Sequence, residues 1–263
     1  PFMSKGNGVG YDFYSFYLQI RGWGRLKNLT LGRYRLHEGM GLILNNDFSF
    51  GKLSTLSALG RNSNVIRAHS SRYAANYLQG AAATVTVVRG LDVTGFVSYR
   101  KIDATLKDGG IQTILTSGLH RTASEMAKKD VASAFLAGGN VSYRRGALHV
   151  GATGFYNSFS LPLMPNRKLL YKRFAPVGSA FWNASVDYSY VSPRLVVQGE
   201  TATGSCGVVA TVNAMSYVFS NRFSLVALQR FYPYRYYSLY ARSFADGTSV
   251  QDESGVYLGG SWT

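Results

Sequence analysis

Regular alternation of apolar and polar residues is the feature that most constrains this fold. In residues 91–103 the odd positions are mostly Leu, Val and Tyr, and most even positions are polar. In 180–190 Ala, Trp, Val and Tyr alternate with Asn, Ser and Asp. A period of two is typical of a β-strand with one apolar face and is not the period of a helix. The sequence therefore predicts an all-β fold.

The extended segments pair as antiparallel hairpins with short turns, such as Arg89-Gly90 and Arg145-Gly146. The predicted segments are 11–21, 26–36, 80–88, 91–103, 138–144, 148–156, 180–190, 194–203, 208–214, 223–232 and 255–262. This is about 11 strands, most of them of about 9 to 13 residues, longer than the usual 5 or 6 of globular sheets.

Connections between these segments alternate in length. Short turns fall at 22–25, 89–90, 145–146, 192–193 and 219–222, and long connections fall near 45–77, 104–135, 159–178 and 233–254. Only the connection around Gly204 to Cys206 breaks this pattern. Long strands with alternating connection lengths predict an antiparallel up-and-down transmembrane β-barrel with short periplasmic turns and long extracellular loops. Residues 1–263 would form this single domain.

A soluble β-sandwich is the alternative, but it usually has shorter strands and turn signals every 8 to 12 residues or so. Aromatic side chains near strand ends fit the girdles of a membrane barrel: Tyr99, Tyr143, Tyr156, Tyr188, Tyr190 and Tyr217. No run approaches the roughly 18 apolar residues of a spanning helix. The expected location is the cell outer membrane, where lipid and lipopolysaccharide would be partners.

Composition excludes a disordered chain and favours anionic partners. The chain is 46% hydrophobic with 3 Trp, 19 Tyr and 15 Phe, and 28 basic against 13 acidic residues give a net charge of +15. A disordered basic tail would lack these aromatic residues. Cys206 is the single cysteine, which excludes an internal disulfide.

Polar side chains on the face opposite the apolar one are expected to line a hydrated lumen. These candidates are Arg33, Arg35, Arg100, Asn140, Arg144, His149, Asn183, Asp187, Gln198 and Glu200. Cations in a lumen favour anions passing through or resting there. The alternative is that the basic residues are solvated rim charges and members of lumen ion pairs, for instance with Asp92, Asp187 or Glu200.

The long connection 111–129 is expected to plug the lumen or to cover the barrel outside. Its candidate residues are Ser117, His120, Arg121, Lys128 and Lys129. Ser124 is expected to N-cap a short helix that ends at Lys128-Lys129.

Neither catalysis nor metal binding is expected. The four histidines lack the spacing of a metal site, and nothing in the sequence implies a cofactor. A Ser, His and acid set built on His149 with Ser142 or Ser185 is the alternative, but nothing marks either serine as a nucleophile. We expect His149 to be a polar lumen residue and the protein to be non-enzymatic.

Four stretches carry a family resemblance beyond periodicity. They are GYDFYSFYLQIRGWGRLKNLTLGRYRLHEGMGLILNNDFSFGK (10–52), SGLHRTASEMAKKD (117–130), GGNVSYRRGALHVGATGFY (138–156) and YYSLYARSFADGTSVQDESGVYLG (236–259). They resemble the barrel region of Bacteroidota outer-membrane proteins, in many of which a helix-hairpin-helix domain of the competence DNA-binding type precedes the barrel. The resemblance implies an outer-membrane barrel and no established activity. No such helical segment occurs in these residues, so its DNA binding is not carried over.

The sequence leaves three functions open. The first is a porin-like transport conduit or docking barrel for anionic solutes or polymers, and the second is a structural or accessory subunit of an outer-membrane protein complex. DNA uptake or handling is the third, supported only by the family's separate domain and by interleaved basic and aromatic residues in 230–237. Because bacterial barrels have an even strand number, eleven strands predict a portion of a larger barrel.

Overall fold

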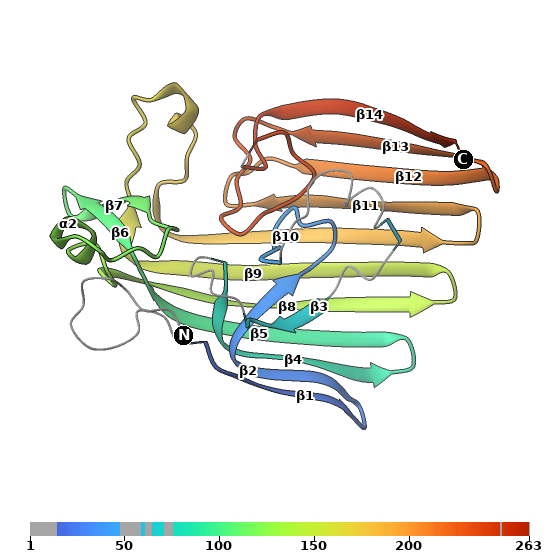
Figure 1. Ribbon diagram of the computed structural model, residues 1–263, viewed down its shortest axis with the longest axis horizontal. Helices are drawn as coiled ribbons and strands as arrows, with labels where there is room; N and C mark the ends of the chain where they lie inside the picture. The colour runs from blue at the N-terminus through green and yellow to red at the C-terminus, as the bar shows by residue number, and fades with distance from the viewer. Residues whose placement is uncertain (1–14, 48–58, 61–64, 71–75, 248, 263) are drawn as a thin grey trace.

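The computed structural model describes residues 15–47, 59–60, 65–70, 76–247 and 249–262, and they form one curled antiparallel sheet (Figure 1). The strands are β1 Tyr17–Trp23, β2 Leu26–His37, β3 Val65–Ala68, β4 Leu78–Val88, β5 Leu91–Ile102, β6 Ala104–Lys107, β7 Gly110–Ile114, β8 Ala132–Arg145, β9 Leu148–Leu163, β10 Gly178–Val191, β11 Leu195–Gly204, β12 Ala210–Ser220, β13 Phe223–Tyr232 and β14 Glu253–Trp262. Two short helical turns, α2 Ala123–Met126 and η1 Leu170–Lys172, lie in the connections.

Eleven of these strands follow one another in chain order across the sheet: β1-β2-β4-β5-β8-β9-β10-β11-β12-β13-β14. Each pairs antiparallel with the next, which confirms the predicted all-β, up-and-down fold. β1 and β14 are its two edges, and within the described residues they do not pair with each other. β3, β6 and β7 are short additions within the long connections.

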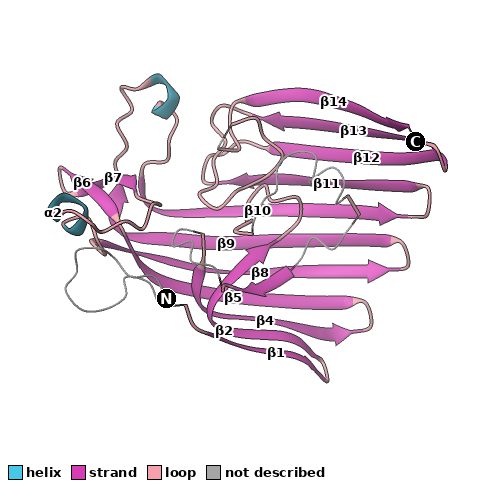
Figure 2. Cartoon of the chain, viewed as in Figure 1, coloured by secondary structure: helices cyan, strands magenta, loops and turns pink. Residues whose placement is uncertain are grey.

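Short turns gather at one end of the sheet and long connections at the other (Figure 2). At the short-turn end, Gly90 has φ +86°, and a Cβ there would lie 2.4 Å from the Arg144 carbonyl oxygen. Glycine is needed because an L side chain would be strained in φ and blocked by the neighbouring hairpin. The short connection 205–209 between β11 and β12 lies at the long-loop end, so it is the exception that the sequence indicated.

The outer face carries two aromatic levels with an apolar band between them. On β10, Trp182 and Tyr190 are 48% and 42% exposed, and Val186 midway between them is 56% exposed. The cross-strand neighbour of Trp182 is Tyr156, which is also exposed, so one level continues across β9 and β10. Eight residues span roughly 27 Å along a strand, or about 20 Å at a tilt of about 40°, close to the roughly 25 Å band of outer-membrane barrels.

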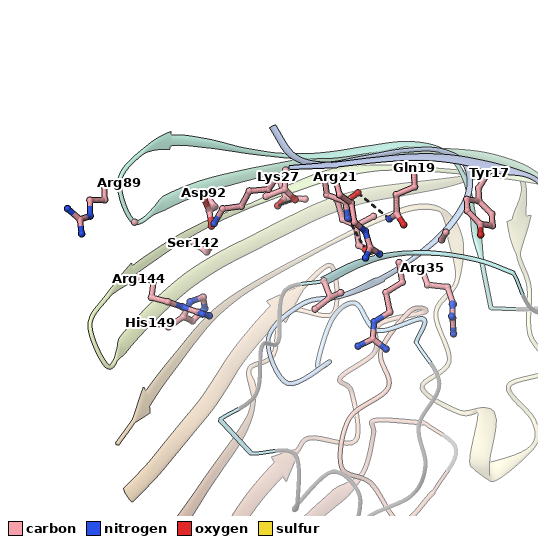
Figure 3. Close-up of a pocket in the computed structure, with 18 residues that line it drawn as sticks. Tyr17, Gln19, Arg21, Lys27, Arg35, Arg89, Asp92, Ser142, Arg144 and His149 are labelled. Atoms are coloured by element: carbon pink, nitrogen blue, oxygen red, sulfur yellow. Dashed lines mark hydrogen bonds and ion pairs between the residues drawn. The ribbon is translucent and has the colours of Figure 1, made fainter. Parts of the chain in front are cut away.

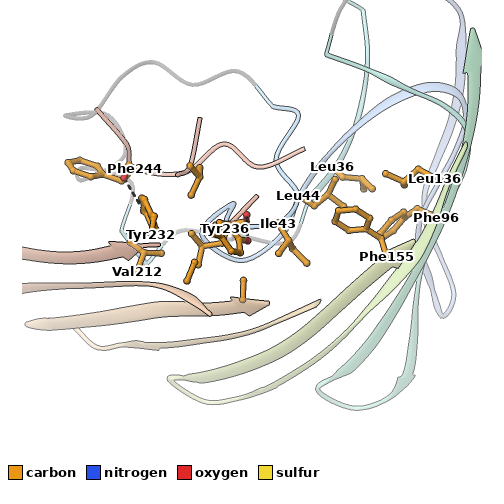
Figure 4. Close-up of a cluster of buried hydrophobic side chains, with 14 of the residues drawn as sticks. Leu36, Ile43, Leu44, Phe96, Leu136, Phe155, Val212, Tyr232, Tyr236 and Phe244 are labelled. Carbon is orange, nitrogen blue, oxygen red and sulfur yellow. Dashed lines mark hydrogen bonds between the residues drawn. The ribbon is translucent and has the colours of Figure 1, made fainter. Parts of the chain in front are cut away.

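Two inward segments fill part of the interior, and we call them the inner plug: residues 38–47 after β2 and residues 233–246 after β13. They meet through a bridge between Leu44 and Tyr240, and the Tyr236 hydroxyl donates to the Leu42 carbonyl at 2.8 Å. Figure 4 shows Ile43 and Tyr236 between the β12–β13 wall and the opposite wall of the sheet. The inner plug therefore supplies much of the hydrophobic core.

The apolar face of β12 is a correction to the sequence prediction. The predicted barrel had its alternating Val, Ala, Leu and Tyr residues outside, but Ala210, Val212 and Ala214 are buried on the inside. They point inward because the inner plug packs against them and removes their side chains from water.

For the connection 111–129 the sequence leaves two alternatives, a plug in the lumen or a cover outside the barrel. The segment with Ser117, His120, Arg121, Lys128 and Lys129 lies with α2 and the β6–β7 hairpin at the long-loop end (Figure 1). The α2 N-cap is Thr122 and not Ser124, because the Thr122 hydroxyl accepts the Glu125 N–H at 3.2 Å. No helix in the described part of the chain is long and apolar enough to cross a membrane.

Replacing Val186 by arginine tests whether the outer band faces lipid. A charge at the middle of a barrel's lipid-facing band costs about 2–4 kcal/mol. Val186→Arg should lower the free energy of unfolding in lipid vesicles by this amount, measured by denaturant titration. Leu170→Arg is the matched control, since Leu170 is 85% exposed in η1 outside the band. Equal, small effects of both variants would show that the band faces water.

Candidate functional site

A cavity of about 950 Å³ opens on the inner face of the sheet near its short-turn end (Figure 3). Its lining residues come from β1 to β5, from β8 and β9, and from the Arg89-Gly90 turn. The polar uncharged members include Gln19, Asn28, Thr94 and Ser142. Period-two alternation places them there, because every second residue of a strand faces the same side.

Positive charge dominates this cavity. Six of the described lining residues are Arg or Lys: Arg21, Lys27, Arg35, Arg67, Arg89 and Arg144. Asp92 is the acidic residue among them, and it forms an ion pair with Lys27. A concave surface lined by one sign of charge concentrates counter-ions, so the cavity attracts anions.

Asp47 of the inner plug borders the cavity and binds two of its arginines. Its Oδ1 lies 2.9 Å from Arg35 Nη1, and its Oδ2 lies 2.8 Å from Arg67 Nη1. The carboxylate thus bridges β2 and β3 in the way that a bound anion would bridge two guanidinium groups.

A buried acidic cluster lies next to the cavity, across β9, β10 and β11. His149, which lines the cavity, hydrogen-bonds through Nε2 to Asp187 Oδ2 at 2.9 Å. Asp187 is the cross-strand neighbour of Glu200, whose Oε2 accepts the backbone N–H groups of Met40 at 2.7 Å and Leu42 at 3.0 Å. Burial, and then Asp187 and Glu200, raise the pKa of Glu38 well above its ordinary value. The inner plug therefore brings a third carboxyl group to this cluster.

The structure divides the predicted lumen residues among several environments. Arg35, Arg144 and His149 line the cavity, and Asp187 and Glu200 belong to the acidic cluster. The remaining residues lie elsewhere. Arg33 and Arg100 stack on the ring of Tyr77, at 4.6 and 4.8 Å from its centre. The other three form hydrogen bonds: Asn140 donates to Thr153, Asn183 donates to the Tyr237 carbonyl, and Gln198 accepts the Gly60 N–H.

The predicted loop residues form local contacts at the long-loop end. His120 Nε2 lies 2.8 Å from Asp103 Oδ2, and Arg121 pairs with Glu125 one helical turn later. The Lys128 carbonyl accepts the Ala104 N–H, and Lys129 lines a smaller cavity with Arg33 and Arg100. Ser117 is exposed.

Several residues of the site were not predicted. Arg21 and Lys27 flank the first turn, and Arg21 has the same parity as Gln19, so extending the alternation to the turn would have found it. Glu38 and Asp47 carry no such signal, because the segment between them has no strand periodicity.

Within the described residues, no group of three or more His, Cys, Asp or Glu side chains is arranged to hold a metal ion.

Comparison with known proteins finds similarity in fold only. No protein-family model and no curated protein matches the chain. Among solved structures, a loop L8 deletion mutant of OmpT, an outer membrane protein of Vibrio cholerae, has 11% identity and a TM-score of 0.35, covering 78% of this chain and 69% of that one. In-vitro folded OmpT from the same organism has 11% identity and a TM-score of 0.37, covering 89% and 76%. Its trimer form has 10% identity and a TM-score of 0.33, covering 79% and 66%. All three are described as outer-membrane proteins.

The sequence-based prediction that the protein is non-enzymatic is wrong, because it excluded catalysis too early. It rested on nothing in the sequence marking Ser142 or Ser185 as a nucleophile, whereas the structure pairs His149 with Asp187 and places Ser185 two residues before Asp187 on the same inward face.

Removing the Tyr236 hydroxyl tests how the inner plug is held. Burial raises the pKa of this phenol, so it stays protonated and donates to the Leu42 carbonyl. Losing one such bond costs about 0.5–1.5 kcal/mol, equivalent to roughly two- to tenfold faster local opening. Tyr236→Phe should speed hydrogen exchange of the Asn45 and Asn46 amides by this factor. Tyr143→Phe on the outer face is the control, and equal exchange in both variants would contradict the assignment.

Proposed function

We propose that this outer-membrane β-sheet protein binds anionic solutes in its cationic cavity and acts as a conduit for them. The single observation that carries the proposal is the concentration of six Arg and Lys side chains around one cavity of about 950 Å³. This volume lies at the upper end of the roughly 300–1,000 Å³ typical of small-molecule sites.

The kind of cation favours oxyanions. Five of the six basic lining residues are arginines, whose planar guanidinium donates two parallel hydrogen bonds to a carboxylate, phosphate or sulfonate. Gln19, Asn28 and Ser142 add neutral polar groups that suit the rest of a hydrophilic solute. A small molecule with two or more anionic groups therefore fits the chemistry of this wall.

Orientation follows as a second part of the proposal, with the long-loop end facing the cell exterior and the short-turn end facing the periplasm. The exposed loop around η1 carries Arg167, Lys168, Lys172 and Arg173, which suit the phosphate groups of lipopolysaccharide. In this orientation the cationic cavity opens toward the periplasm.

Anion binding is tested with benzene disulfonate, a dianion that does not titrate near neutral pH. Arg144→Gln removes a guanidinium from the cavity wall, and one charge-assisted hydrogen bond contributes about 1.5–3 kcal/mol. The Kd from calorimetry in detergent should rise about 10- to 100-fold. Arg222→Gln removes the same charge from an exposed turn at the same end of the sheet and should leave the Kd unchanged. Absence of binding by the unaltered protein would contradict the proposal and favour an accessory subunit.

Orientation is tested by cysteine labelling in a Cys206→Ser background. Thr122→Cys lies at the long-loop end and Arg145→Cys at the short-turn end, and both positions are exposed. A membrane-impermeant maleimide added to intact cells should label the first and spare the second, while both should react after the outer membrane is permeabilised. Labelling in the opposite order would reverse the orientation.

A further inference from the structure

The first inner-plug segment, residues 38–47, is held at both of its ends by carboxyl groups. Asp47, at the C-terminal or far end of the segment, binds Arg35 and Arg67 of the cavity. Glu38 at its near end is buried beside Asp187 and Glu200. The segment therefore links the acidic cluster to the cationic cavity.

The Asp47 contact occupies groups that an anionic solute would need. Arg35 and Asp47 side chains are each only 10% exposed, so water screens their attraction weakly. Arg67 is 55% exposed and reaches Asp47 from the other side. A solute anion must compete with this internal carboxylate for both guanidinium groups.

The near end of the segment is packed tightly against the acidic cluster. Gly39 has φ +57°, and a Cβ there would lie 2.8 Å from the Glu200 carboxyl group. Glu200 in turn accepts the N–H groups of Met40 and Leu42, which fixes the backbone of the segment against β11. A change in the charge of any group at this contact therefore changes how strongly residues 38–47 dock.

Docking of Glu38 depends on its protonation. Oxygens Oε2 of Glu38 and Oδ1 of Asp187 are buried without a hydrogen-bond partner. Three buried carboxylates repel one another, so the docked segment favours the protonated form of Glu38. Because the docked state raises the pKa of Glu38, docking is strongest at a pH below the ordinary pKa of Glu. It weakens as the pH rises toward the raised pKa of Glu38.

We propose that residues 38–47 form a proton-controlled autoinhibitory latch, in which Asp47 occupies two cavity arginines as an internal anion while Glu38 is docked against Asp187 and Glu200. Deprotonation of Glu38 weakens the docking of the segment and lets the solute compete with Asp47 for Arg35 and Arg67. The latch rests on the proposed anion binding and adds its regulation.

Other titratable groups that surround the cluster belong to four elements. They are His37 on β2, His149 on β9, Tyr232 on β13 and Tyr236 in the second plug segment. His149 binds Asp187 and also lines the cavity, so it faces both the cluster and the solute. The pH dependence that belongs to the latch is therefore identified by its loss in variants of Glu38 and Asp47.

The experiment measures the Kd for benzene disulfonate from about pH 5 to about pH 8, above the ordinary Glu value near 4.3. Affinity of the unaltered protein should increase about 5- to 50-fold over this range, a typical coupling between two sites. Glu38→Gln imitates the protonated side chain and should stay at the weak, low-pH affinity throughout. Asp47→Asn should bind tightly at every pH, while Asp108→Asn, an exposed loop variant of equal charge change, should behave as the unaltered protein.

The outcomes separate the latch from the proposed function. Binding that Arg144→Gln weakens but that neither Asp47→Asn nor Glu38→Gln alters would overturn the latch alone. No binding by any variant would overturn the proposed function together with the latch. A second measurement does not depend on the solute: hydrogen exchange of the Met40 and Leu42 amides should be slower in Glu38→Gln than in the unaltered protein at about pH 8, and equal rates would overturn the latch.

Discussion

Continuous main-chain hydrogen bonding from each strand to the next is the constraint on which this structure depends. In lipid, each unpaired N–H or C=O costs several kcal/mol, so strands must be long and continuously paired across the membrane. β5 and β8 show this continuity, with an unbroken register from Leu91–Tyr143 to Ile102–Ala132. Once the pairing is fixed, alternation decides which side chains face inward, and the interior acquires its polar groups.

The interior separates its charges. Basic side chains gather along the half of the sheet formed by β1 to β9, and the acidic cluster lies on β10 and β11 with Glu38 added from the inner plug. His149 on β9 belongs to both, because it lines the cavity and binds Asp187. Residues 38–47 join the two regions a second time through Asp47, and this is the connection that the proposed latch uses.

Periodicity in the sequence predicted the eleven long strands and their order, since the strand period does not depend on distant contacts. It could not predict the inner plug, because Leu42, Ile43 and Leu44 are three consecutive buried residues without a strand or helix period. The same gap explains the error at Val212, whose inward direction is set by packing against the plug and not by its own strand. Arg144 and His149 could be assigned to the inner face from alternation, whereas the partners of Glu38 arise only when distant strands meet.

Ion selectivity of the reconstituted protein tests the central claim that this cationic interior admits anions. A planar bilayer that contains the full-length protein separates two solutions of different KCl concentration. The reversal potential then gives the permeability ratio of chloride to potassium. A cationic interior should give a reversal potential of the sign set by chloride, and this potential should move toward zero when Arg21 and Arg89 are both replaced by glutamine. A potential set by potassium, or a bilayer without protein-dependent current, would contradict it.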